Sequence, residues 1–309
     1  MLRRRSAFTL LELLTVIAIL ALLMGILVPS LSSARHQAKA NVCLSKLKGL
    51  GTSFTIYTTE NKDTYPPHRI RKANPSSSFT VDYVNEYNRK WPRWHWFLET
   101  ESGPPINPEP FKRLEAPWGD EGLSENFKGL TLTNDVFICP TLDDDMYSHD
   151  ERSGAYGYNY QYLGNARQDS SPDKWDNFPV TNQRIKAPGR TVLIADSRGK
   201  GPRHGEHSFT LDPPRLATEQ FAKNFGPDGG ISDVNAISPV EMRHRKRGNV
   251  IFADAHGEAM ILKELGYEGA EEGKVIPIDP TATPTGTWTN KLWTGSGSDP
   301  MAPGAQATP

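Results

Sequence analysis

The longest apolar stretch of the chain lies near its N-terminus. Residues 8–28 carry a single charged side chain, Glu12, and are otherwise mostly leucine, isoleucine, valine and alanine. A helix rises about 1.5 Å per residue, so this stretch spans roughly 30 Å, the thickness of the hydrocarbon core of a bilayer. Three arginines precede it at positions 3–5. The pattern therefore predicts a transmembrane helix over residues 8–29, with the N-terminus in the cytoplasm and the rest of the chain outside.

A second apolar pattern predicts that the helix continues beyond Pro29. Apolar side chains recur at spacings of four, three, four and three residues, which places them on one face of a helix. They are Cys43, Leu47, Leu50, Phe54 and Tyr57. We expect residues 30–60 to pack this face on a domain. Gly49 and Gly51 each weaken the helix by roughly 1 kcal/mol relative to Ala, so packing must offset that loss.

The rest of the chain shows short strand patterns separated by stretches without periodicity. Runs typical of strands occur over residues 135–139, 155–163, 191–195, 249–253 and 258–262. The last two flank residues 254–257, which predicts a β-hairpin. We therefore expect an α+β fold, in which the long N-terminal helix packs on an antiparallel β-sheet with large loops. The globular domain is expected over residues 61–270, followed by a Pro-, Gly- and Thr-rich tail over residues 271–309.

Composition narrows the classes of function. The 309 residues include 35 Lys and Arg and 36 Asp and Glu, a net charge of −1 with neutral His. This balance gives no global electrostatic argument for nucleic-acid binding. Two cysteines are too few for a disulfide-rich scaffold or a four-cysteine zinc site. Because the sequence contains no nucleophile elbow, phosphate loop or zinc-protease helix, we expect a protein that is not an enzyme.

Three interpretations of the N-terminal segment compete. A cleaved secretory signal peptide has an apolar core of about 7–15 residues followed by a small-residue cleavage site, and the segment fits neither feature. An uncleaved signal anchor fits the length but leaves Glu12 unexplained, since a carboxylate inside an apolar membrane helix is costly and usually functional. The third interpretation accounts for Glu12 and rests on a resemblance.

The segment resembles the start of type IV prepilins and type II secretion pseudopilins, which have a pilin-like fold. A short basic leader ends at Ala7, where the family usually has Gly, and Phe8-Thr-Leu-Leu-Glu12 follows. The resemblance implies that a prepilin peptidase removes residues 1–7 by cutting between Ala7 and Phe8, and methylates the new Phe8 amine. It implies that Glu12 pairs with the terminal amine of a neighbouring subunit during assembly. It also implies that Pro29 bends the helix.

Four downstream blocks are similar to a pseudopilin-like family whose C-terminal element is termed the prepilin-type processing-associated domain. The blocks are Cys43-Leu-Ser-Lys-Leu-Lys-Gly-Leu-Gly51, Phe137-Ile-Cys-Pro140, Tyr156-Gly-Tyr-Asn159, and His244 followed after nine residues by Asp254-Ala-His256. Ala255 stands where the family usually has Gly, so the turn of the hairpin is less permissive. This resemblance implies an assembly class and no defined molecular task.

Cys43 and Cys139 are the only cysteines, and the predicted topology places both outside the cytoplasm. Cys43 lies on the apolar face of the helix, and Cys139 ends a predicted strand. We hypothesise a disulfide that ties the helix to the sheet, worth about 4 kcal/mol in the entropic account because it closes a long loop. The alternative is a pair of buried free thiols.

Histidine and carboxylate side chains supply candidates for a metal site, because both are suitable ligands. The candidates are Asp196, His204, His207, His244, Asp254 and His256. Their spacing matches no helical His pair or paired-Cys motif. We therefore favour a hydrogen-bonded turn in which Asp254 caps the hairpin and His244 donates to it. No cofactor is expected, and zinc or calcium is the weaker alternative.

Three other local patterns have a structural interpretation that we favour. The acidic residues 143–145 suggest calcium but lack the alternating ligands of a calcium loop, which indicates a solvated turn. The aromatic cluster at residues 91–97 is interpreted as a small core beneath loops and not as a recognition surface. The basic run at residues 243–247 is interpreted as a solvated arm of the hairpin, and no nucleic-acid partner is expected.

Together these features predict a structural pilin-like or pseudopilin-like subunit of a type II secretion or type IV pilus-like assembly. Its partners would be other pilin-like subunits, packed through the N-terminal helix, as well as the prepilin peptidase and inner-membrane lipid. The chain would cross the inner membrane once, with its globular domain in the periplasm or, after assembly, at the cell surface. The alternative is a membrane-anchored extracytoplasmic binding or catalytic domain that uses the leader for export.

Overall fold

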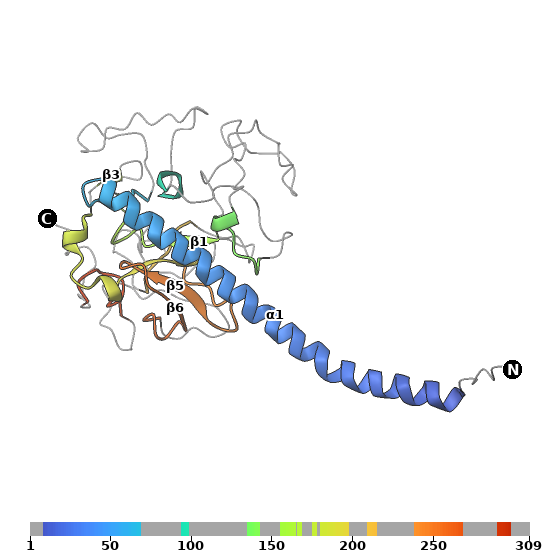
Figure 1. Ribbon diagram of the computed structural model, residues 1–309. Helices are drawn as coiled ribbons and strands as arrows, with labels where there is room; N and C mark the ends of the chain where they lie inside the picture. Colours follow the sequence, from blue (N-terminus) through green and yellow to red (C-terminus); the bar gives the residue numbers. More distant parts are fainter. Residues whose placement is uncertain are drawn as a thin grey trace, which may run out of the picture.

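The computed structural model describes ten segments of the chain, and all structural statements below concern them. They are residues 9–68, 94–98, 135–142, 155–164, 166–168, 175–177, 180–197, 209–214, 238–267 and 289–297. Figure 1 shows a long helix that lies across a small sheet at one end and projects far beyond the domain at the other. The architecture is the pilin-like α+β fold that the sequence predicts.

Helix α1 is one continuous element over Leu10–Glu60. Thr9 caps its first turn, because the Thr9 side chain accepts from the Glu12 N–H while the Glu12 carboxylate accepts from the Thr9 N–H. Pro29 lies within the helix without ending it. Asn61 closes the last turn by donating its backbone N–H to the carbonyls of Tyr57 and Thr58. The helix predicted from the two apolar patterns is confirmed.

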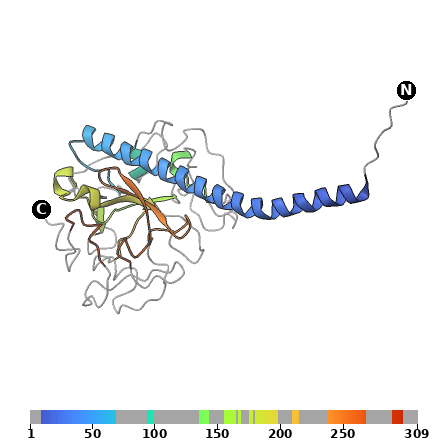
Figure 2. The ribbon, with the colours of Figure 1, turned by 60° about the horizontal axis from the view of Figure 1, so that its bottom comes forward.

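The two halves of α1 have opposite environments. The first half is apolar enough and long enough to cross a membrane, and none of its most apolar window is buried in the protein. Figure 2 shows this half leaving the domain as a gently curved rod. In the second half, the predicted apolar face is buried against the domain at Cys43, Leu47, Leu50 and Phe54. One helix therefore combines an exposed apolar rod with a core element.

The main sheet has four antiparallel strands in the order β1-β4-β5-β6. Strand β1 spans Tyr156–Tyr158, β4 spans Val192–Asp196, β5 spans Gly248–Phe252 and β6 spans Gly257–Met260. The three strands β1, β4 and β5 are buried throughout. Two further short strands, β2 (Ala166–Gln168) and β3 (Trp175–Asn177), pair with each other in a separate antiparallel ribbon.

The hairpin predicted around residues 254–257 is confirmed as β5 and β6. Its turn holds Ala255 at φ +67°, a left-handed conformation that an alanine adopts at some cost in strain. Asp254 accepts from the His256 N–H at 3.2 Å and from the His256 ring at 2.5 Å. The His256 ring also stacks on Phe252, with ring centroids 4.4 Å apart. These contacts hold the turn without the glycine.

The predicted strand over residues 135–139 is wrong. The segment forms a 3-10 turn over Asp135–Phe137, and the Leu142 N–H donates to the Cys139 carbonyl in the turn that follows. Short apolar runs do not distinguish strand from turn, and here the chain bends so that Phe137 and Cys139 both point into the core. The strand predicted over residues 155–163 is shorter than expected, because the chain turns after Tyr158.

Aromatic side chains connect the helix to the domain core. Trp94 begins a 3-10 turn over Trp94–Phe97, is buried, and stacks on Phe54 with ring centroids 5.5 Å apart. Its indole N–H donates to the Phe209 carbonyl. Trp94 is a core residue as predicted, but it belongs to the main core and not to a separate small core. Residues 91–93 lie outside the described segments.

A segment within the range assigned to the tail also packs into the core. Residues 289–297 place Trp293 edge-on against Tyr267, with its indole N–H donating to the Leu265 carbonyl. The Leu292 carbonyl accepts from the N–H of Val192 at the start of β4. The buried domain therefore includes chain beyond residue 270, while residues 301–309 lie outside the described segments.

The two helix glycines provide a matched test of how α1 packs. A β-carbon on Gly51 would lie 2.8 Å from Ile251 Cγ2 and 3.4 Å from the Ala255 β-carbon, whereas one on Gly49 would meet nothing within 4 Å. We expect Gly49→Ala to raise the free energy of unfolding by up to about 1 kcal/mol through helix propensity. We expect Gly51→Ala to lower the free energy of unfolding by about 1 kcal/mol or more, because the overpacking against Ile251 outweighs the gain in helix propensity.

The measurement is urea unfolding of the detergent-solubilised full chain, followed by the fluorescence of its buried tryptophans. Equal effects of the two substitutions would show that α1 does not approach β5 as closely as the structure indicates.

Candidate functional site

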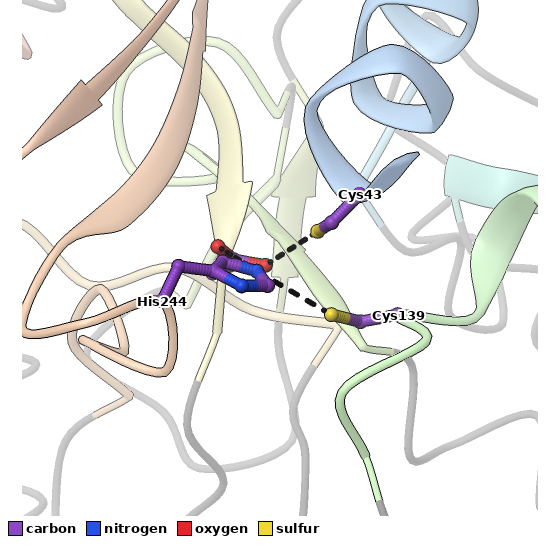
Figure 3. Close-up of side chains that lie close together, drawn as sticks. Cys43, Cys139 and His244 are labelled. Carbon is purple, nitrogen blue, oxygen red and sulfur yellow. Dashed lines mark hydrogen bonds and ion pairs between the residues drawn. The ribbon is translucent and has the colours of Figure 1, made fainter. Parts of the chain in front are cut away.

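Four side chains with metal-ligand chemistry converge between α1 and the sheet. Cys43 comes from the buried face of α1, Cys139 from the turn after residues 135–137, Asp196 from the end of β4, and His244 from the turn that precedes β5. Figure 3 shows Cys43, Cys139 and His244 pointing toward one another from these separate elements. We call this group the Cys–Asp–His cluster.

The polar atoms of the cluster lie close together. Cys43 Sγ is 3.3 Å from Asp196 Oδ1, His244 Nε2 is 3.3 Å from Asp196 Oδ2, and Cys139 Sγ is 3.5 Å from His244 Nε2. All four potential ligand atoms lie within 4.8 Å of one another. The three residues Cys43, Cys139 and Asp196 are fully buried, and His244 is 5% exposed. The cluster is therefore buried in the interior of the protein.

A surrounding layer of hydrogen-bonding groups holds the cluster. The Tyr156 hydroxyl lies 3.4 Å from Cys43 Sγ, and the Thr141 hydroxyl lies 2.9 Å from Cys139 Sγ. The backbone N–H of Asn249 donates to Asp196 Oδ2 at 2.7 Å. Burial raises the pKa of Tyr156 well above its ordinary value, so its hydroxyl stays protonated and can donate to sulfur. Both sulfurs and the carboxylate thus have a partner outside the cluster.

Arg243 supplies positive charge beside the cluster. Its guanidinium lies 3.8 Å from Asp196 Oδ1 and 2.5 Å from Glu241 Oε2, and it also donates to the Ser197 carbonyl at 2.5 Å. The Arg243 side chain is only 6% exposed. The interpretation of residues 243–247 as a solvated arm is therefore wrong for the first two residues of the run, which face inward, and holds for exposed Arg245 and Lys246.

The environment shifts the pKa values of the two thiols in opposite directions. Burial raises the pKa of Cys43, and the adjacent Cys139 and Asp196 raise it further. Burial also opposes ionisation of Cys139, but hydrogen bonds from Cys43 and His244 and the charge of Arg243 lower its pKa well below the ordinary value. For His244, burial opposes protonation, yet hydrogen bonds to Asp196 and Cys139 raise its pKa to about 9. The surroundings thus favour the ionised form of Cys139 over that of Cys43.

Local backbone geometry aims His244 into the core. Arg245 and Lys246 have φ values of +54° and +65°, so they form a tight two-residue turn between His244 and Arg247. The backbone N–H groups of His244 and Arg247 each donate to the other's carbonyl. Neither turn residue is a glycine, so the turn carries strain that the packing around His244 must offset.

The predicted cysteine pair meets, but the two sulfurs are not bonded. Both Cys43 and Cys139 are free thiols in the structure, so the predicted disulfide is absent. The prediction that they lie together between helix and sheet is confirmed. The two cysteines lie 3.3 Å apart, and each sulfur also contacts a different third residue, Asp196 for Cys43 and His244 for Cys139.

The structure separates the other predicted candidates into different places. Asp196 and His244 join the two cysteines, whereas Asp254 and His256 pair with each other on the exposed tip of the hairpin. The predicted contact between His244 and Asp254 is therefore wrong; His244 contacts Asp196 and Cys139. The residues His204, His207 and the acidic run 143–145 lie outside the described segments.

Sequence reasoning missed the outer layer formed by Arg243, Tyr156 and Asn249. A signal for the site was present, because each of the four downstream blocks contributes a residue to the cluster or its outer layer: Cys43, Cys139, Tyr156 and His244. Asp196 directly follows the predicted strand over residues 191–195. Asp196, already a candidate by residue type, is the fifth residue, and its position at the end of a buried strand places it in the cluster.

The N-terminal motif is described from Thr9 onward. Glu12 is exposed and accepts hydrogen bonds from the Thr9 N–H and the Thr9 hydroxyl, both at 2.8 Å. Within a single chain, Glu12 thus completes the helix cap and has no charged partner among the described residues. Ala7 and Phe8, the predicted processing residues, lie outside the described segments.

Comparison with known proteins identifies the N-terminal motif. Residues 2–28 match the family described as "Prokaryotic N-terminal methylation motif". The chain therefore carries a prepilin-type N-terminal methylation motif. No curated protein matches the chain, and no solved structure matches it. The motif and the exposed apolar half of α1 together indicate a membrane-anchored protein with an extracytoplasmic domain.

Arg243 and Arg247 provide a matched test of the buried charge at the site. Arg243→Gln removes the buried guanidinium that faces Asp196 and Glu241, so we expect the free energy of unfolding to fall by about 3 kcal/mol. Arg247 lies 3.8 Å from Glu264, and both side chains are about half exposed. Arg247→Gln should therefore change the free energy of unfolding by less than about 1 kcal/mol. Urea unfolding of both full-length variants in detergent measures the difference. Similar effects would mean that Arg243 does not neutralise buried charge.

Proposed function

We propose that this protein is a structural pilin-like subunit of a type II secretion or type IV pilus-like assembly. The observation that carries the proposal is the continuity of the methylation motif at residues 2–28 with the single helix Leu10–Glu60. The motif supports processing by a prepilin peptidase between Ala7 and Phe8 and methylation of the Phe8 amine. The helix supports assembly through lateral packing of the N-terminal segments of neighbouring copies.

The exposure of the apolar half of α1 supports this role on physical grounds. Large apolar side chains from Leu10 to Leu31 lie exposed on the isolated chain. Leaving so much apolar surface in water is strongly unfavourable, so lipid or other helices must cover it. Lipid covers it before assembly, and the helices of neighbouring subunits cover it afterwards. The proposed location is the inner membrane, crossed once with the N-terminus in the cytoplasm and the domain in the periplasm or at the cell surface.

Glu12 links the motif to assembly in this proposal. Its carboxylate stands in an otherwise apolar stretch, where an uncompensated charge is costly. The terminal amine of Phe8 on a neighbouring subunit would neutralise it and set the axial register of the packed helices. Pro29 would permit the bend that the packed helices need. The proposed role is structural and not enzymatic, and burial of the Cys–Asp–His cluster supports a structural use of that site as well.

The proposed processing predicts the mass of the mature chain. We expect the protein purified from its native host to begin at Phe8, to lack residues 1–7, and to carry one methyl group on the terminal amine. Intact-mass spectrometry with sequencing of the N-terminal peptide measures this. A mature chain that retains Met1 would refute processing, and with it the proposed assembly through a new Phe8 amine.

Substitutions at Glu12 and Thr9 separate the proposed charge pairing from the helix cap. Glu12→Gln keeps side-chain acceptor and donor atoms for the cap but removes the charge. Thr9→Ala removes the hydroxyl of the cap but keeps the charge. If Glu12 pairs with a neighbouring amine, we expect Glu12→Gln to reduce the incorporation of subunits into sedimentable fibres at least tenfold, whereas Thr9→Ala reduces it little.

Both variants must insert into the membrane fraction at the wild-type level, which immunoblotting of washed membranes checks. The reverse pattern, with normal assembly of Glu12→Gln and defective assembly of Thr9→Ala, would assign Glu12 to the cap alone and contradict the pairing.

A further inference from the structure

We propose that Cys43, Cys139, Asp196 and His244 bind one zinc ion in a closed four-ligand site. The inference is independent of the proposed assembly role, because it concerns only the buried end of α1 and the sheet. Its starting point is that two thiols, one imidazole and one carboxylate from four separate elements place their ligand atoms within 4.8 Å of one another.

Three distances between potential ligand atoms match the edge lengths of a tetrahedron around zinc. Zinc bonds of about 2.3 Å to sulfur and about 2.0–2.2 Å to nitrogen or oxygen give ligand-to-ligand distances of roughly 3.3–3.8 Å at tetrahedral angles. The measured distances are 3.3 Å between Cys43 Sγ and Asp196 Oδ1, 3.5 Å between Cys139 Sγ and His244 Nε2, and 3.3 Å between His244 Nε2 and Asp196 Oδ2. A small shift of the carboxylate would bring one oxygen into the tetrahedron.

The surrounding groups have the character of an outer coordination layer. Ligands of structural metal sites are held by hydrogen bonds from outside the site. Here the Tyr156 and Thr141 hydroxyls lie beside Cys43 Sγ and Cys139 Sγ, respectively, and the Asn249 N–H fixes one oxygen of Asp196. The other oxygen, Oδ1, is the one that faces Cys43. Both oxygens of the carboxylate thus face a member of the cluster, since Oδ2 also lies 3.3 Å from His244 Nε2, and Oδ2 is held from outside the cluster as well.

The charges also suit a divalent cation. Two thiolates and one carboxylate carry three negative charges, so a bound Zn²⁺ leaves one negative charge on the centre. The Arg243 guanidinium, 3.8 Å from Asp196 Oδ1, compensates it. On binding, two Zn–S bonds form and His244 binds through Nε2, and the protons that the two thiols and the His244 Nε2 still carry leave to solvent. No oxidant or reductant is required.

The ligand types select zinc over the other common cations. Thiolate ligands disfavour calcium and magnesium, which take oxygen ligands. Four protein ligands in a fully buried centre leave no open position for a water or substrate, which is the arrangement of structural zinc sites. The ion would join α1, β4 and the turns that hold Cys139 and His244. It would therefore fix α1 on the sheet near the point where the exposed half of the helix leaves the domain.

A disulfide between Cys43 and Cys139 is the competing chemistry for the same two sulfurs. It would remove both thiolates by a two-electron oxidation and leave Asp196 and His244 buried without a role. In the structure Cys43 Sγ contacts Asp196, and Cys139 Sγ contacts His244, as Figure 3 shows for the second contact. A converging set of four ligands fits this arrangement better than a bond between two.

The test begins with metal analysis of the full-length protein. The chain is purified in detergent without a histidine tag or chelator, and its zinc content is measured by plasma mass spectrometry. We expect about one zinc per chain. We also expect removal of zinc with a strong chelator to lower the melting temperature, zinc to restore it, and calcium or magnesium to leave it lowered. Cobalt should give the visible absorption of a tetrahedral thiolate site.

Two substitutions and a matched control locate the ion. Cys139→Ser and His244→Gln should each reduce bound zinc at least tenfold at matched zinc concentration. His256→Gln should retain it, because His256 lies at the exposed hairpin tip and pairs with Asp254. If the ligand variants fail to fold, the chelation and cobalt measurements on the wild-type chain still decide the proposal.

Two results would overturn it. One is a reduced, folded wild-type chain that takes up no zinc even when zinc is added. The other is intact-mass analysis of the native protein in which both thiols resist alkylation until a reductant is added, which would assign the sulfurs to a disulfide.

Discussion

Helix α1 meets the sheet along a face of small and apolar side chains, and at Gly51 its backbone comes so close to β5 that a β-carbon would lie 2.8 Å from Ile251 Cγ2. This close approach fixes both the rotation of the helix and its position along the sheet. Cys43 lies about two turns toward the N-terminus from Gly51, so the same contact places its sulfur beside Asp196 at the end of β4. The register of the helix on the sheet therefore builds the buried cluster.

The same helix also sets the direction in which the apolar half leaves the domain. Because α1 is continuous from Leu10 to Glu60, any load on its exposed half is transmitted directly to the buried half. The buried half is held by apolar packing at Leu47, Leu50 and Phe54 and by the polar cluster at Cys43. The assembly role proposed above would need such an anchor, and Cys43 is the first buried residue of α1.

Much of the fold follows from local sequence patterns. The spacing from Cys43 to Tyr57 predicted the buried face of α1. The runs at residues 155–163, 191–195, 249–253 and 258–262 predicted the four strands of the main sheet, although the first run is longer than strand β1. The strand prediction for residues 135–139 was wrong because a short, mostly apolar run does not show whether a neighbouring strand will pair with it. Tertiary contacts instead fold its first three residues into a 3-10 turn. The segment at residues 289–297 gave no periodic signal, yet Trp293 became one of the largest fully buried side chains.

The sequence by itself determined the N-terminal motif and the long helix, because hydropathy, charge order and helical periodicity are properties of neighbouring residues. It also supplied every member of the cluster as a candidate, since Cys43, Cys139, Asp196 and His244 each stood out by residue type. Only the tertiary structure decided that these four belong together and that Asp254 and His256 do not. The four come from distant parts of the chain, and their convergence depends on strand pairing and helix register, which no local pattern encodes.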